Sequence, residues 1–103
     1  MNAAERLWRA LAGHDWRSAG SQFQPNATVT WPHTGARMGV VEYVATQRER
    51  AARGAQFASA RVVTEGRNVV VEGRLGEEAC AGFYDLHDGL IAGAVEYWVG
   101  EPA

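Results

Sequence analysis

The chain contains no lysine and no long hydrophobic run, and each absence excludes a class of partner. All ten basic residues are arginine and the net charge is −2, so the sequence offers no strongly basic surface for binding nucleic acid. The densest basic run, Arg48, Arg50 and Arg53, falls where a helix is predicted to end, and there cations interact favourably with the helix dipole. No apolar run approaches the roughly 18 residues that a membrane-spanning helix needs. We therefore expect neither a nucleic-acid partner nor a membrane partner.

Cysteine and histidine are also scarce, whereas aromatic residues are abundant. The single Cys80 excludes a disulfide within the chain, and no charged-then-apolar leader opens it, so we expect a cytoplasmic protein. His14, His33 and His87 lack the short spacing of metal ligands, so we expect no metal site and no cofactor. Four Trp, three Tyr and three Phe stand among 103 residues, and such side chains build cores and also line small-molecule pockets. Residues 1–103 are enough for one domain with a single core.

Hydrophobic periodicity divides the chain into a mostly helical first half and an all-strand second half. Asn2 and Glu5 form a capping pair for a helix that Gly13 ends, and Asp15 caps a short helix that a turn at 24–26 ends. The remaining predicted elements are a short hairpin over 27–38, a helix over 40–53, and strands over 56–64, 68–75, 78–87 and 90–99. This order predicts an α+β fold, in which four long antiparallel strands and a short N-terminal hairpin are covered on one face by three helices.

Several of the predicted strands are apolar on both faces, which bears on assembly. Val69, Val70 and Val71 run consecutively, and neighbours such as Tyr97 and Trp98 point to opposite faces. Three helices cover only one face of the sheet. A second copy of the chain is the simplest cover for the other face, so we expect a homodimer.

Three motifs follow one another along the chain. They are Leu-x-x-x-Asp-Trp at Leu11–Trp16, Thr-Trp-Pro-x-x-Gly at Thr30–Gly35, and Phe-Tyr-Asp-Leu-x-Asp-Gly-x-Ile leading to Glu-Tyr-Trp within Phe83–Trp98. In this order and spacing they resemble the SnoaL-like, or nuclear transport factor 2-like, superfamily. The resemblance implies a cone-shaped fold, in which the concave face of a curved sheet and the helices enclose an apolar pocket. It also implies a homodimer formed through the convex face.

The superfamily includes ketosteroid isomerases, polyketide cyclases, epoxide hydrolases, dehydratases and proteins without catalysis, so the resemblance leaves the function open. Matched through Pro32, the aspartate base of a ketosteroid isomerase corresponds to Trp31, which accepts no proton. The acid of the oxyanion hole corresponds to Gly82, and the tyrosine of the first helix corresponds to Leu7 or Trp8. We therefore do not expect isomerase chemistry by that mechanism.

Glu96 is the main candidate for a catalytic acid or base. The same matching places it on the concave face of the last strand, next to the strand that carries Tyr84. A partly desolvated carboxylate there is suited to proton transfer. The alternative is that Glu96 forms an ion pair with Arg37 or Arg74 and only closes the rim of the pocket.

His33 is the second candidate base, because it follows a strand end at the expected mouth of the cone and its ordinary pKa suits the role. The alternative is an exposed turn histidine. Cys80 has no neighbour that would activate it, and we expect an inert packing residue. The side chains expected to line the ligand pocket are aromatic: Trp8, Trp31, Tyr43, Tyr84 and Trp98. The alternative for them is a filled core without a cavity.

Three functions follow from these candidates. The first is binding of a small apolar molecule. The second is an enzyme of the same fold, an isomerase, cyclase or dehydratase, with Glu96 or His33 as the base and Tyr84 or Tyr43 as the hydrogen-bond donor. The third is a non-catalytic dimeric module without a ligand. A filled interior would count against the first two.

Overall fold

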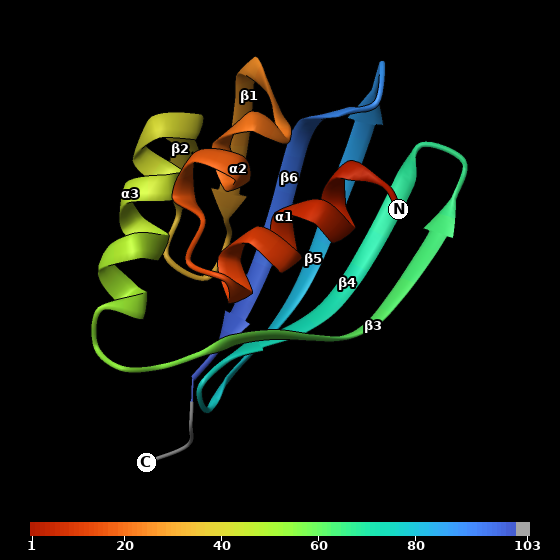
Figure 1. Ribbon diagram of the computed structural model, residues 1–103. Helices are drawn as coiled ribbons and strands as arrows, with labels where there is room; N and C mark the ends of the chain where they lie inside the picture. Colours follow the sequence, from red (N-terminus) through yellow and green to blue (C-terminus); the bar gives the residue numbers. More distant parts are fainter. Residues whose placement is uncertain (101–103) are drawn as a thin grey trace.

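The computed structural model describes residues 1–100, which form three helices and one six-stranded sheet (Figure 1). The helices are α1 (Ala3–Ala12), α2 (Trp16–Ser21) and α3 (Val40–Ala51), and none of them is long and apolar enough to cross a membrane. The strands are β1 (Phe23–Trp31), β2 (Ala36–Gly39), β3 (Phe57–Glu65), β4 (Asn68–Leu75), β5 (Glu78–His87) and β6 (Leu90–Val99). They lie in the order β2-β1-β6-β5-β4-β3. The predicted α+β class is confirmed.

The N-terminal helices begin where the sequence predicts. The side chain of Asn2 accepts a hydrogen bond from the backbone of Glu5, whose own side chain accepts one from the backbone of Asn2, so the capping box is complete. Asp15 caps α2 by accepting from the Ser18 backbone at 3.1 Å. Helix α3 ends at Ala51, two residues earlier than predicted. Both caps satisfy backbone N–H groups in the first turns of α1 and α2 that have no partner within the helix.

The predicted turn over 24–26 is wrong, because β1 runs through it. The pairing of β1 with β6 shifts register between Phe23 and Thr28, and Pro25 lies in this irregular stretch, where the missing N–H of proline breaks no ladder bond. Strand β1 pairs in parallel with β6 and antiparallel with β2. The hairpin of β1 and β2 therefore belongs to the same sheet as the four long strands, and the sheet is mixed rather than wholly antiparallel.

The four long strands form the predicted meander. The bounds of β4, β5 and β6 agree with the prediction, and β3 is shifted by one residue. Gly66, Gly76 and Gly89 adopt positive φ angles of 58°, 59° and 79° in the three connecting turns, a conformation that favours glycine. The turns thus set the register that places alternate side chains on opposite faces of the sheet.

All three helices cover one face of the curved sheet, with α1 across the long strands and α3 beside β1 and β2 (Figure 1). Two glycines on this face allow aromatic rings to lie directly on the backbone of the sheet. A Cβ atom on Gly73 would stand 2.5 Å from the ring of Trp8, and one on Gly82 would stand 2.5 Å from the Tyr84 hydroxyl. The core between the helices and the sheet is therefore built largely of flat aromatic side chains.

Candidate functional site

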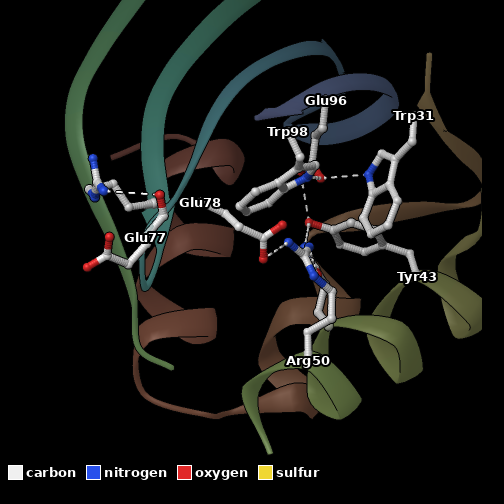
Figure 2. Close-up of polar contacts among 9 residues, drawn as sticks. Trp31, Tyr43, Arg50, Glu77, Glu78, Glu96 and Trp98 are labelled. Atoms are coloured by element: carbon white, nitrogen blue, oxygen red, sulfur yellow. Dashed lines mark hydrogen bonds and ion pairs between the residues drawn. The ribbon is translucent and has the colours of Figure 1, made fainter. Parts of the chain in front are cut away.

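Glu96 lies at the centre of the concave face, and its side chain is completely buried. Four aromatic side chains donate hydrogen bonds to its carboxylate. The indole N–H groups of Trp31 and Trp98 reach Oε1 at 3.0 and 3.1 Å. The hydroxyls of Tyr43 and Tyr84 reach Oε2 at 2.9 and 2.6 Å. Figure 2 shows three of these residues converging on Glu96 from β1, α3 and β6.

The hydrogen-bonding capacity of the Glu96 carboxylate is fully used. A carboxylate offers about four lone-pair sites, and two indoles and two phenols supply four donors. The predicted ion pair of Glu96 with Arg37 or Arg74 is wrong. Both arginines are exposed and alternate with buried neighbours on their strands, so their side chains point away from the concave face.

A second layer of hydrogen bonds orients the tyrosines. Trp8 donates its indole N–H to the Tyr84 hydroxyl at 2.8 Å, and Gln47 donates to the Tyr43 hydroxyl at 3.2 Å. Gln47 is completely buried, and it lies four residues after Tyr43 on the same side of α3. We call the side chains joined in this network the Glu96 cluster: Trp8, Trp31, Tyr43, Gln47, Tyr84, Glu96 and Trp98.

Arg50 closes the outer side of the Glu96 cluster. Its Nη1 donates to Gln47 Oε1 at 2.7 Å, and its Nη2 lies 3.2 Å from Glu78 Oε2 (Figure 2). The guanidinium carbon lies 4.1 Å from the ring centroid of Trp98 and 5.1 Å from that of Trp31. The sequence prediction places Arg50 only at the end of a helix. Its spacing of three residues from Gln47 indicates that it lies on the inward side of α3.

The two tyrosines of the cluster are held in their protonated form. Burial, and then the nearby Glu96 carboxylate, raise the pKa of Tyr43 and Tyr84 well above the usual tyrosine value. Burial and the same carboxylate also raise the pKa of the Cys80 thiol, which is 3% exposed. The tyrosines therefore act as donors to Glu96, and the inert packing role predicted for Cys80 agrees with its position.

The five aromatic side chains predicted to line a pocket are brought together, but they fill the space between them. Trp8 stacks on Trp98 with 6.0 Å between ring centroids, and Trp31 meets Trp98 edge-on at 6.4 Å. All five of these aromatic side chains are buried. The concave site is therefore a packed polar cluster and not an open cavity.

The second predicted base, His33, lies outside the cluster. It sits in the exposed turn between β1 and β2, and its ring stacks on Trp31 at 5.7 Å between centroids. Its role as a base stays a prediction. Within residues 1–100 no three His, Cys, Asp or Glu side chains lie close enough to hold a metal ion.

The convex face of the sheet exposes apolar side chains. Phe83 and Tyr97 are 44% and 45% exposed, and their rings meet edge-on at 6.0 Å. Val63 and Val99 extend this surface with exposures of 54% and 65%. We call this surface the convex patch and define it by its apolar side chains: Val63, Val70, Phe83, Val95, Tyr97 and Val99.

Comparison with known proteins supports the fold. No protein-family model matches the sequence, and no curated protein matches it. Among solved structures, a nuclear transport factor 2-like protein of unknown function from Burkholderia xenovorans is 17% identical with a TM-score of 0.81, over 98% of this chain and 83% of that one. A putative ketosteroid isomerase from Kribbella flavida is 22% identical with a TM-score of 0.76, over 98% and 79%.

A third similar structure is a protein of ketosteroid isomerase-like fold from Catenulispora acidiphila, solved in complex with trimethylamine. It is 15% identical with a TM-score of 0.73, over 92% of this chain and 83% of that one. At these identities the likeness concerns the fold. The chain has the nuclear transport factor 2-like, SnoaL-like fold that its motifs predicted.

Proposed function

We propose that this nuclear transport factor 2-like domain is a non-catalytic homodimeric module that assembles through its convex patch. The observation that carries the proposal is the difference between the two sheet faces. The concave face is filled and its one carboxylate is saturated with hydrogen bonds, whereas the convex face leaves Phe83 and Tyr97 nearly half exposed. A contiguous exposed apolar surface of this kind is typical of a protein interface.

The composition of the convex patch suits a second copy of the same chain. Its centre is aromatic and aliphatic, while Thr28, Asn68 and Asp85 border it with polar groups. An apolar centre with a polar rim is the usual anatomy of an interface. A two-fold axis through the sheet would let Phe83 and Tyr97 of one protomer pack against the same patch of its partner.

Sedimentation equilibrium tests the dimer. We expect the mass of two chains at micromolar concentration for the wild type and of one chain for Phe83→Arg, because a buried unpaired charge at the centre of an interface is strongly unfavourable. Val41→Arg is the matched control, since Val41 is 85% exposed on α3, away from the patch. A monomeric wild type, or a Phe83→Arg protein that stays dimeric, would refute the proposal.

Binding of a small molecule at the Glu96 cluster is the second candidate function, and the position of Arg50 favours it. Arg50, a long side chain in the last turn of α3, closes the cluster on its outer side, so an entrance opens if its head moves. The trimethylamine complex of the Catenulispora acidiphila protein supports the idea that a fold of this kind holds a small amine. A ligand here would have to displace Arg50, because the interior is otherwise filled.

Proton-transfer chemistry receives less support from the geometry. Glu96 has no free lone-pair site for a substrate proton, and His33 lies outside the cluster. A catalytic role for either residue stays a prediction from the sequence, as does the cytoplasmic location.

Native mass spectrometry of the purified protein tests the second candidate. We expect a bound small molecule, and we expect Trp98→Leu to lose it while Trp16→Leu, a substitution outside the Glu96 cluster, retains it. A wild-type protein that carries no small molecule and binds none would refute this second candidate. The dimeric module without a ligand would then be the function.

A further inference from the structure

The head of Arg50 occupies a corner formed by two indole rings. Its guanidinium carbon is 4.1 Å from the Trp98 centroid and 5.1 Å from the Trp31 centroid, and the two ring planes meet at 64°. A cation within about 6 Å of an aromatic face is attracted by the negative face of the ring. The corner therefore already holds a cation, one that the chain supplies itself.

The carboxylate behind this corner makes it electronegative. All four hydrogen-bond donors to Glu96 are neutral groups, indole N–H and phenol O–H. Within residues 1–100 no arginine or histidine forms an ion pair with Glu96. Its charge thus lies in a buried site where electrostatic interactions are stronger than in water, and it favours a cation over an anion nearby.

The walls of the corner are fixed, whereas the arginine head in it belongs to a long side chain with several rotatable bonds. Glu96 anchors both indole N–H groups, so the rings keep their positions without Arg50. Arg50 itself has one neutral partner, Gln47, and one charged partner, Glu78, which is 43% exposed. The Arg50 side chain is itself only 13% exposed and lies over both indole rings, so its head leaves the corner only when another cation takes over these contacts.

We propose that the corner of Trp31 and Trp98 is a binding site for a small alkylated ammonium ion, which takes the place of the Arg50 head. This inference rests on the second candidate function, binding of a small molecule at the Glu96 cluster. The methyl groups of such an ion would contact the indole faces, and its charge would lie in the field of Glu96. A neutral molecule of the same shape would gain only the apolar contacts.

Choline and its neutral analogue 3,3-dimethylbutan-1-ol test the proposal, because they differ at one atom, nitrogen or carbon. We expect choline to quench or shift tryptophan fluorescence and to bind at least about tenfold more tightly than the alcohol, as measured by fluorescence titration and calorimetry. An alcohol that binds as tightly as choline would overturn the cation site.

A second experiment removes the Arg50 guanidinium group, which competes with choline for the corner of Trp31 and Trp98. Arg50→Met keeps an apolar stem but removes the charge, so we expect the affinity for choline to rise about tenfold. Arg48→Met is the matched control, since Arg48 lies on the exposed side of the same helix turn, and its affinity should equal that of the wild type. Equal choline affinity in Arg50→Met and Arg48→Met would overturn displacement of Arg50.

The possible results distinguish failure of the cation site from failure of the small-molecule function on which it rests. If neither probe binds even to Arg50→Met, the cation site fails, and native mass spectrometry of the purified protein decides the small-molecule function by itself. If the alcohol binds that variant as well as choline does, the small-molecule function stands and the cation site fails. The dimer formed through the convex patch is tested separately and is unaffected by either result.

Discussion

The two faces of strands β5 and β6 differ sharply in their chemistry, although consecutive residues build them. Glu96 and Tyr84 point to the concave face, and within residues 1–100 every buried side-chain nitrogen and oxygen atom has a hydrogen-bond partner, while Phe83 and Tyr97 point to the convex face and stay exposed. On the concave face the polar groups form hydrogen bonds with one another, whereas on the convex face apolar side chains are exposed. The acid identified from the sequence therefore has its hydrogen bonds satisfied within the fold, and an exposed apolar surface lies on the opposite face of the same strands.

The largest effect should come from removing the acceptor at the centre of the Glu96 cluster. Glu96→Ala would leave four donors buried without a partner, and we expect a loss of about 4 kcal/mol or more in the free energy of unfolding. This is a large part of the stability of a domain of this size. Urea denaturation at one fixed protein concentration measures it. A loss under about 1 kcal/mol would show that water or a repacked side chain replaces the carboxylate.

The second largest effect is the dependence of stability on alkaline pH. The native pKa values of Tyr43 and Tyr84 are raised above the unfolded value of about 10, so both contribute stability that is complete below pH 10. This stability is lost as the pH rises from about 10 towards the native values, by about 1.4 kcal/mol per pH unit for each tyrosine. Urea midpoints between pH 8 and pH 11 should fall accordingly.

The buried thiol needs a control in that experiment, because the pKa of Cys80 is also raised. The stability that the protonated thiol contributes is therefore also lost as the pH rises. The series is therefore measured in a Cys80→Ala background. Adding Tyr43→Phe should reduce the alkaline slope, because one of the two buried hydroxyl groups is then absent. A urea midpoint that does not change up to pH 11 in the Cys80→Ala protein would contradict the raised pKa values of Tyr43 and Tyr84.

An added methyl group distinguishes the packing of the two faces. Gly82→Ala would place a Cβ atom 2.5 Å from the Tyr84 hydroxyl, and we expect a cost of about 1–3 kcal/mol because the ring must leave its place on the sheet. Gly93→Ala is the matched control, since a Cβ there would meet its nearest atom, the Thr28 carbonyl oxygen, at 4.0 Å. Thermal unfolding of the two variants should differ clearly. Equal stability would mean that the concave face has room for an added methyl group beside Tyr84.

Sequence patterns predicted the elements and the face that each residue occupies, but they did not predict how the cluster closes. Strand alternation combined with the match to the superfamily placed Glu96 and Trp98 on the concave side, and the structure confirms both positions. The pairing of Glu96 was missed because its donors come from β1, α3, β5 and β6, which no local pattern relates. The path of β1 through Pro25 was missed for a similar reason, since its pairing with β6 is a long-range contact.

The smallest effect should come from the same chemical change made on each face. Glu72 lies on the outer side of β4, 59% exposed and 3.4 Å from the Nε of Arg61, and Glu72→Gln should change the free energy of unfolding by less than about 0.5 kcal/mol. Glu96→Gln keeps one acceptor oxygen for the indoles and offers the tyrosine hydroxyls an amide, so we expect about 1–2 kcal/mol. Urea curves of both variants at low and high salt give the comparison. If Glu72→Gln costs as much as Glu96→Gln, the carboxylate of the cluster is no more structural than an exposed one, and the contrast between the faces fails.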